Sequence, residues 1–296
     1  MRRIGTIVFL TVAVLATHGA RHDAWGEEAG AAKPAGPTCD RAAFRLVLDV
    51  GHTAQVPGAK SARGLHEFDF NLRLAKLIEQ QLLDAGFART VLLVTDGPAL
   101  PSLARRVARA NAARADLLLS IHHDSVPNAL LEKWEYNGEP HSYSDRFRGH
   151  SLFVSYENRD RRGSLLFGRL LGLALKSRGL HYTPHYTEKI MGRRRRELLD
   201  AEAGVYRYDQ LVVLKYPHMP AVLLEAGSII NRDEELLMGT PEHQVVISAA
   251  VVEAVERFCR ERRPSKPARI ARPAAPAKAR LRPAAVTVPA GAADRP

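Results

Sequence analysis

Short apolar runs alternate with longer amphipathic stretches through most of this chain, between Arg41 and Arg260. We predict strands at Phe44–Val50, Thr90–Thr95, Leu117–Ile121, Ser151–Tyr156, Gln210–Leu214 and Ala221–Glu225. We predict helices at Asn71–Ala85, Leu100–Ala113 and Ser164–Ser177, and from Thr240 to about Arg260. Near-continuous apolar strands that alternate with helices are typical of parallel sheets covered on both faces. The sequence therefore predicts a single α/β domain, with a mostly parallel twisted sheet of about six strands and helices on both faces.

The two ends of the chain lack this pattern. Met1–Ala20 contains two arginines, an apolar run and small residues, which is the layout of a signal peptide. The apolar run is too short for a membrane anchor. Residues 21–40 predict a flexible lead-in, and residues 261–296, rich in Pro, Ala, Lys and Arg, predict a disordered basic tail. We therefore expect an exported protein, periplasmic or extracellular, whose folded domain spans residues 41–260.

The net charge of +11 comes mostly from the tail. From Arg260 onward the chain has ten Lys or Arg and two Asp or Glu, so eight of the net positive charges lie there. No aromatic residues interleave with these basic ones, so the charge does not predict a nucleic-acid partner. Such a tail is typical of a solubilising extension, and it could also rest on an anionic wall polymer or membrane surface.

The two cysteines, Cys39 and Cys259, lie just before the first predicted strand and near the end of the last predicted helix. In an exported protein, a disulfide between them would tie together the two ends of the folded domain. Two isolated thiols make an incomplete zinc site, which disfavours metal binding by this pair. A disulfide is our hypothesis for the two residues.

Ionisable residues follow three of the predicted strands at the point where each strand ends. His52 follows the first strand, His122 the third, and Glu225 closes the last, while Glu67 lies in the loop before the helix predicted at Asn71. Because ligands of such sheets bind beyond the carboxyl ends of the strands, we expect these side chains at one edge. Two imidazoles and one carboxylate suit catalytic zinc, with the fourth position left to water. Taken singly, each residue would also fit a capping or core role; their convergence favours a metal site.

The residues around these positions form a series of ordered motifs. The first motif is Leu48-Asp49-Val50-Gly51-His52, with Gly58-Ala59 after it, and the second is Gly64-Leu65-His66-Glu67, with Asn71-Leu72. The third comprises Leu103, Arg106 and Asn111, then Ala115-Asp116-Leu117 and Ser120-Ile121-His122. The fourth runs from Met219 to Gly227, with Asn231 after it. From roughly Phe44 to Phe258, this pattern resembles the zinc-dependent N-acetylmuramoyl-L-alanine amidases, the cell-wall family with a type 3 amidase catalytic domain.

The resemblance implies that His52, Glu67 and His122 bind Zn²⁺ and that Glu225 is the catalytic carboxylate. It makes residues 41–260 a zinc amidase catalytic domain. The implied partner is peptidoglycan, both glycan strand and stem peptide, and the implied reaction hydrolyses the amide between N-acetylmuramic acid and L-alanine. We expect the enzyme to be a monomer.

Three short stretches depart from the family pattern. The loop Thr53–Pro57 lacks the usual Gly-Gly-x-Asp-like sequence, although it carries none of the implied ligands. His123 stands where a small residue is common, and it could support the ligands from behind or contact the substrate. Alternation along a strand turns it away from His122, and this favours a surface neighbour of the site. Ser228 and Ile229 stand where an aromatic residue is frequent, which affects only the expected substrate groove.

A longer departure is the segment 181–204, which is an insertion relative to the family pattern. Four consecutive arginines, Arg193 to Arg196, precede several acidic residues, and this composition favours a solvated helix with charged faces. The alternative is a lid that controls access or holds the substrate, on which a regulatory protein could act. Some family members occlude the zinc with an acidic side chain on an inserted helix, so Glu197 and Glu202 are candidates for that role by analogy only.

Other functions stay open on the sequence alone. A zinc peptidase acting on wall peptides could use a similar ligand set, but its first His and Glu normally lie close together as His-x-x-Glu, unlike His52 and Glu67. A non-catalytic wall-binding homologue would have no reason to keep all four site residues. A Ser or Cys nucleophile is disfavoured because the sequence has no Gly-x-Ser-x-Gly elbow and both cysteines lie at domain edges.

Overall fold

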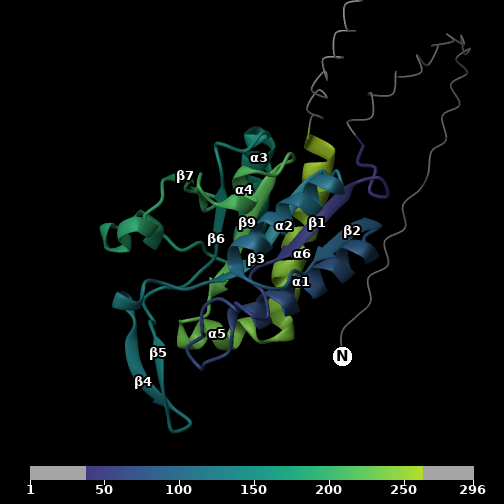
Figure 1. Ribbon diagram of the computed structural model, residues 1–296. Helices are drawn as coiled ribbons and strands as arrows, with labels where there is room; N and C mark the ends of the chain where they lie inside the picture. The colour runs from purple at the N-terminus through teal and green to yellow at the C-terminus, as the bar shows by residue number, and fades with distance from the viewer. Residues whose placement is uncertain (1–37, 263–296) are drawn as a thin grey trace, which may run out of the picture. The chain divides into compact units, whose positions relative to one another are not determined.

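The computed structural model describes residues 38–262, which fold around one seven-stranded sheet (Figure 1). The strands are β1 (Arg45–Val50), β2 (Arg89–Leu93), β3 (Leu117–Asp124), β4 (Glu132–Tyr136), β5 (Glu139–Tyr143), β6 (Ser151–Val154), β7 (Leu198–Asp200), β8 (Val205–Arg207) and β9 (Ala221–Ser228). The helices are α1 (Glu67–Asp84), α2 (Ala99–Ala112), α3 (Arg161–Lys176), α4 (Val212–Lys215), α5 (Arg232–Met238) and α6 (Pro241–Glu261), with 3₁₀ helices η1 (Asn128–Leu130), η2 (His185–Thr187) and η3 (Lys189–Arg194). The signal peptide predicted at 1–20, most of the lead-in and nearly all of the basic tail lie outside the described residues and stay predictions.

The sheet has the strand order β2-β1-β3-β9-β6-β8-β7. β2, β1, β3 and β9 are parallel to one another, whereas β6 runs antiparallel to β9. β8 is parallel to β6, and β7 ends the sheet antiparallel to β8. The predicted α/β fold with a mostly parallel sheet is confirmed. The carboxyl ends of β1, β3 and β9 lie side by side, and this arrangement positions the site.

Both faces of the sheet are covered by helices, which explains why its central strands are nearly continuous apolar runs. Leu46, Leu48 and Val50 of β1 pack into one core with residues of α1, α3 and α6. Val47 points to the other face and packs into a second core with residues of α2 and α4. Leu48 is fully buried, and truncating such a side chain to alanine typically costs about 2–5 kcal/mol.

Two parts of the fold differ from the sequence-based expectation. Gln210–Leu214 was predicted as a strand, but Val212–Lys215 form the short helix α4. A short apolar run fits a buried helix as well as a strand, and here Val213 and Leu214 pack against the sheet. The hairpin β4–β5 was not predicted either. Its turn is Asn137-Gly138, both at positive φ, which is a strong hairpin signal.

The hypothesis of a Cys39–Cys259 disulfide is confirmed. The bond joins the residues just before β1 to the last turns of α6, across a sequence separation of 220. Disulfides persist in oxidising compartments, so this bond is consistent with an exported protein. Within residues 38–262, no helix combines the length and apolarity that crossing a membrane requires.

Replacing Cys39 and Cys259 by serine should lower the free energy of unfolding by about 2–5 kcal/mol. The cross-link restricts the unfolded chain over a separation of 220 residues, and the serine variant removes that restriction. Chemical denaturation with and without reductant measures the effect. Reductant should destabilise the wild type and leave the double variant unchanged; a double variant as stable as the oxidised wild type would contradict the expectation.

His150 should make the stability of the fold depend on pH. Its backbone bonds to His181 and Thr183 and its side chain is buried, and burial lowers its pKa to about 4. A histidine in an unfolded chain titrates near 6.5, so from about pH 6.5 down to 4 the unfolded state binds more protons and stability falls as the pH falls.

Between pH 7 and pH 5, this one group should lower the free energy of unfolding by roughly 2 kcal/mol. Urea denaturation of the metal-free wild type and of His150→Gln at both pH values isolates the contribution. The wild type should lose more stability than the variant on acidification, and equal losses would contradict the assignment.

Candidate metal centre and active site

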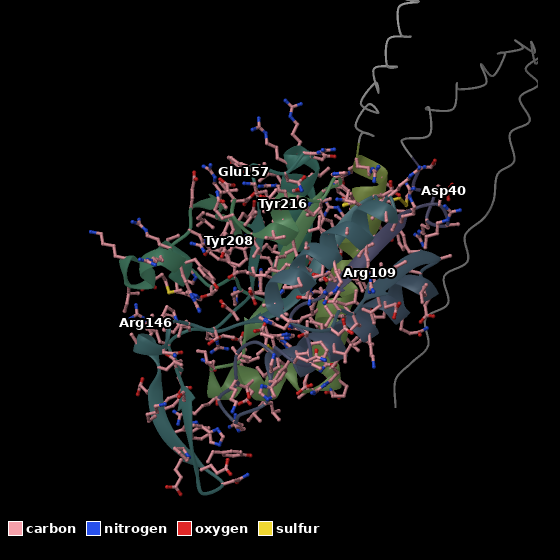
Figure 2. All side chains as sticks on the ribbon, in the orientation of Figure 1. Asp40, Arg109, Arg146, Glu157, Tyr208 and Tyr216 are labelled. Carbon is pink, nitrogen blue, oxygen red and sulfur yellow. A yellow bond between two sulfur atoms is a disulfide. The ribbon has the colours of Figure 1, made fainter. Side chains whose placement is uncertain are left out.

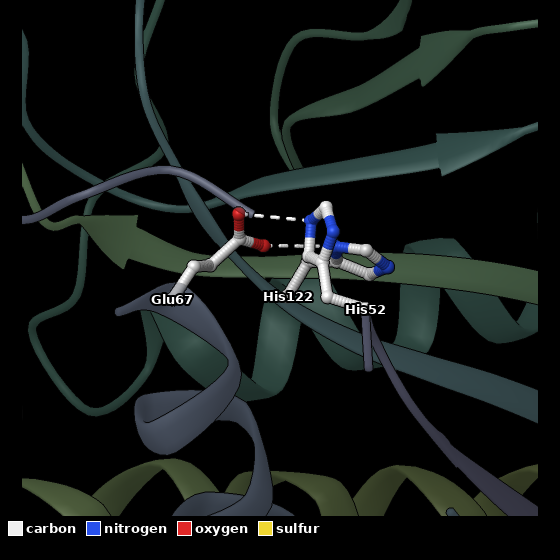
Figure 3. Close-up of side chains that lie close together, drawn as sticks. All are labelled: His52, Glu67 and His122. Atoms are coloured by element: carbon white, nitrogen blue, oxygen red, sulfur yellow. Dashed lines mark hydrogen bonds and ion pairs between the residues drawn. The ribbon is translucent and has the colours of Figure 1, made fainter. Parts of the chain in front are cut away.

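His52, Glu67 and His122 meet at the carboxyl edge of the sheet, as predicted (Figure 3). One ligand atom from each lies within 4.8 Å of the others. His52 Nε2 is 2.9 Å from Glu67 Oε2, and His122 Nδ1 is 2.9 Å from Glu67 Oε1. Within residues 38–262, no other three His, Cys, Asp or Glu side chains lie so close together. This set of two imidazoles and one carboxylate could hold a metal ion.

Glu67 is the first residue of α1, which begins four residues before the helix predicted at Asn71. The positive end of a helix dipole favours a carboxylate there. The carboxylate also accepts hydrogen bonds from the backbone N–H of Ala59 at 3.2 Å and from Asn71 Nδ2 at 3.3 Å. Burial alone would raise the pKa of Glu67, but hydrogen bonds with His122 and His52 outweigh it and hold the pKa well below its ordinary value. Glu67 is therefore ionised, the form that binds a cation.

His52 lies in a tight turn after β1 and has a φ of 67°, which is uncommon for a residue other than glycine. The fully buried Arg106 of α2 stabilises this turn. Its guanidinium donates to the backbone carbonyls of Val50 and His52 and forms an ion pair with Asp49 at 2.8 Å. The sequence motifs include Arg106, but only the structure shows that it supports the backbone of a candidate ligand residue.

Two glycines of the first motif allow the cluster to pack closely. A Cβ atom on Gly51 would lie closer than 3.0 Å to the ring of His122, and one on Gly58 would do the same to Glu67 Oε2. Gly58 also has a φ of 81°, a conformation that only glycine adopts without strain. The cluster is thus enclosed by backbone that leaves no room for a side chain.

Glu225 is the register partner of His122, because the two residues lie opposite each other on the parallel strands β9 and β3. Register partners on neighbouring strands point to the same face of a sheet. Glu225 Oε2 is buried and has no hydrogen-bond partner among the described residues. Burial and then the charges of Asp124 and Glu67 raise the pKa of Glu225 well above its ordinary value. A carboxyl group of this kind is suited to accept and return a proton.

Asp124 joins the site, although the motifs did not single it out as a site residue. It lies two positions after His122 on β3 and therefore on the same face, a periodicity that could have identified it. The hydroxyl of Tyr186 donates to Asp124 Oδ1 at 2.7 Å. Burial raises the pKa of Asp124 to about 7, so this carboxyl adds a second ionisable group beside Glu225.

His123 points to the opposite face from His122, as alternation predicted, but it is not a surface residue. α1 covers this face, and His123 is buried with Nδ1 at 2.7 Å from Asn71 Oδ1. Its ring centroid lies 5.6 Å from that of Phe70. Burial lowers the pKa of His123 to about 3, so its imidazole is neutral and braces α1 against β3.

A cavity of about 510 Å³ opens over the cluster. Its floor contains the three candidate ligands together with Asp124 and Glu225. The wall is built mainly of apolar and aromatic side chains and two arginines, which are Val126, Phe153, Tyr186, Arg194, Arg196, Tyr208, Leu211 and Leu223. The polar residues His123, Ser125 and Asn128 also line it. The cavity therefore combines an ionisable floor with an apolar and basic wall. Such a lining suits a ligand that has both apolar and polar groups.

The segment 181–204 is not the solvated helix favoured by its composition. It forms η2, η3 and β7, and Gly192 interrupts η3 with a φ of 53°. Tyr186 of this segment is buried against the sheet, where its ring packs on Phe153 of β6 at a centroid distance of 5.0 Å. Aromatic anchoring to the sheet, which composition does not reveal, holds the segment against the cavity.

Glu197 and Glu202 do not occlude the candidate metal site, so the role expected for them by analogy is wrong for this structure. Glu197 pairs with Arg207 at 3.2 Å, and Glu202 pairs with Arg169 at 3.2 Å. Neither acid lines the cavity. Both are satisfied by basic partners on neighbouring elements, and the segment instead brings arginines to the cavity wall.

Residues 46–257 match the family model of N-acetylmuramoyl-L-alanine amidase. The chain belongs to this family. It is 26% identical over 225 residues to the N-acetylmuramoyl-L-alanine amidase AmiA of Escherichia coli, covering 71% of this chain and 74% of AmiA. It is 25% identical over 235 residues to AmiC of Neisseria meningitidis, covering 72% of this chain and 52% of AmiC. Among solved structures, the amidase Ami1 from Mycobacterium smegmatis superposes with a TM-score of 0.57 at 20% identity, covering 74% of this chain and 97% of Ami1.

Family membership confirms the resemblance inferred from the motifs, and with it the predicted enzyme class. The family match extends from β1 into α6, so it includes all four predicted site residues. The chain is an N-acetylmuramoyl-L-alanine amidase, a hydrolase of peptidoglycan.

Proposed function

We propose that this amidase uses Zn²⁺, bound by His52, Glu67 and His122, and that Glu225 is its catalytic base and acid. The observation that carries the proposal is the convergence of two imidazoles and an ionised carboxylate within 4.8 Å, with Glu225 as the register partner of His122. Three protein ligands of this kind with one open position are the usual donor set of catalytic zinc. The close glycine packing around the cluster supports a site built for a compact ion.

The reaction is hydrolysis of the amide between N-acetylmuramic acid and L-alanine. An amide is a poor electrophile and an amine a poor leaving group. When bound, Zn²⁺ supplies Lewis acidity, which polarises the carbonyl and lowers the pKa of water to about 7. Glu225 Oε2 accepts the proton of the attacking water and then delivers it to the leaving nitrogen. Because Oε2 is buried without a partner, it is available for that proton, and burial keeps the carboxylate basic.

The place of action follows from the substrate and the disulfide. Peptidoglycan lies outside the cytoplasmic membrane, and the Cys39–Cys259 bond belongs in an oxidising compartment. We therefore place the enzyme in the periplasm or outside the cell. The predicted signal peptide, the monomeric state and a regulatory protein acting on 181–204 remain predictions.

Digestion of purified peptidoglycan tests the activity, with the protein zinc-loaded, stripped by a chelator, and reloaded with Zn²⁺. We expect the loaded and reloaded protein to release intact stem peptides that begin with a free L-alanine amine, and the stripped protein to release none. Peptides cut internally would indicate a zinc peptidase. Binding to peptidoglycan without any release would indicate a non-catalytic homologue, and either result would contradict the proposal.

A further inference from the structure

Two arginines on the cavity wall have no acidic partner among residues 38–262. Arg194 and Arg196 both line the cavity above the candidate metal site, and their side-chain contacts in the described region are with backbone carbonyls and an aromatic ring. A guanidinium group presents five N–H donors in a planar fork that matches a carboxylate. Two such groups beside an amidase site need an explanation.

Arg194 is anchored close to the reacting groups. It ends η3, and its Nη1 donates to the carbonyl of Ser125 at 2.9 Å, directly after β3. This single contact leaves further donors of the guanidinium for a ligand. Its charge acts on the floor of the cavity, where it opposes the rise in the pKa of both Asp124 and Glu225.

Arg196 is held by stacking. Its guanidinium carbon lies 3.9 Å from the ring centroid of Tyr208, a residue that Figure 2 shows beside the inserted segment. Nη1 donates to the backbone carbonyls of Arg193 and Arg195 at 2.8 and 2.9 Å. The backbone N–H of Arg196 donates to the backbone carbonyl of Tyr186 at 2.7 Å. A stacked guanidinium loses little further freedom when it binds a ligand.

The acidic residues of the segment are occupied elsewhere. Glu188 pairs with Arg146, Glu197 with Arg207, and Asp200 and Glu202 with Arg169. None of these acids lines the cavity. The charges that the segment presents to the cavity are therefore those of Arg194 and Arg196.

We propose that Arg194 and Arg196 recognise a carboxylate on the peptide side of the scissile amide, so that the segment 181–204 selects acidic over amidated stem peptides. The inference rests on the proposed function for the position of that amide. The lactyl carboxyl of the muramoyl unit is itself the acyl half of the scissile bond, so the muramoyl unit offers no free carboxylate. The carboxylate that two guanidinium groups would bind must come from the peptide.

Kinetics with two matched substrates test the selection. The first is N-acetylmuramoyl-L-alanyl-γ-D-glutamyl-L-lysinamide with a free glutamyl α-carboxylate, and the second carries a carboxamide at that position. The lysine carboxyl is an amide in both, so the second substrate has no free carboxylate. A charge-assisted hydrogen bond contributes enough for the zinc-loaded wild type to prefer the acid by about tenfold or more in kcat/KM. Arg194→Gln should remove most of this preference, and Arg194→Lys should keep part of it. The readout is the ratio of kcat/KM on the acid to kcat/KM on the amide, because any effect of the lost charge on Glu225 changes both rates alike.

Arg193→Gln is the matched control. Arg193 belongs to the same run of arginines, is exposed, and does not line the cavity, so this variant should keep the wild-type preference. The double variant Arg194→Gln/Arg196→Gln should show no preference. A wild type that does not distinguish the two substrates, or an Arg194→Gln variant that loses rate equally on both, would overturn the inference.

A binding measurement separates this inference from the proposed function. Calorimetry with the released peptide, L-alanyl-γ-D-glutamyl-L-lysinamide, and its amidated twin needs no turnover. Binding that is selective for the acidic peptide and is lost in Arg194→Gln would support the carboxylate site, even if the protein hydrolysed neither substrate. Absence of hydrolysis would defeat only the amidase mechanism. Hydrolysis of both substrates with equal binding of both peptides would defeat the carboxylate site and leave the amidase activity standing.

Discussion

Glu225→Gln should bind one equivalent of Zn²⁺ as the wild type does, yet hydrolyse peptidoglycan about 100- to 10,000-fold more slowly. Glutamine has nearly the same shape as glutamate, so the strand β9 and its pairing with His122 should be preserved. Its amide cannot accept the proton of the attacking water or return one to the leaving nitrogen. The loss should therefore appear in kcat, and not in metal content.

Two measurements on the same preparation check this expectation: zinc content after dialysis, and the rate at which N-terminal alanine appears. Glu197→Gln is the control, because Glu197 pairs with Arg207 on the surface and does not line the cavity. It should keep the wild-type rate, and that result would also weigh against an inhibitory role for this acid. Near-normal turnover by Glu225→Gln would show that another group moves the proton.

His122→Ala should lose both metal and activity. Removing one of three protein ligands also removes the hydrogen bond that helps keep Glu67 ionised. We expect the affinity for Zn²⁺ to fall by more than about 100-fold, beyond the loss that follows removal of a supporting residue, and turnover to fall to background. Titration of the metal-free protein with Zn²⁺ against a competing chelator measures the affinity.

The adjacent histidine provides the control for this variant. His123 lies on the other face of β3, against Asn71 and Phe70, so His123→Gln should still take up one equivalent of Zn²⁺ while losing some stability. If His123→Gln lost the metal and His122→Ala kept it, the ligand assignment on β3 would have to be reversed.

The local pattern of the sequence was sufficient for much of the site. His52 and His122 end apolar runs that were predicted as buried strands, and parallel strands bring their carboxyl ends to one edge. The positions of the polar residues relative to the predicted strands carry this inference. Glu67 was predicted in the loop before a helix at Asn71, whereas α1 begins at Glu67 itself.

The errors come from residues whose environment is supplied by distant parts of the chain. Val212–Lys215 form a helix because Val213 and Leu214 pack into the core beside α2, and a short apolar run does not reveal which partner it will meet. His123 is buried because α1 covers its face of the sheet. The inserted acids pair with Arg207 and Arg169, which lie on other elements.

The sequence by itself predicted the α/β alternation and the polar residues His52, His122 and Glu225 at the ends of strands, because strand periodicity and strand-end positions are local properties. It also offered Cys39 and Cys259 as the two cysteines available for a disulfide. Tertiary structure alone decided which groups share the cavity with the strand-end residues. Asp124 acquires its raised pKa from burial, and Tyr186 and Arg194 reach the cavity only because the segment 181–204 folds back onto the sheet. Burial and charge proximity arise from contacts between residues far apart in the chain, which the local sequence pattern does not specify.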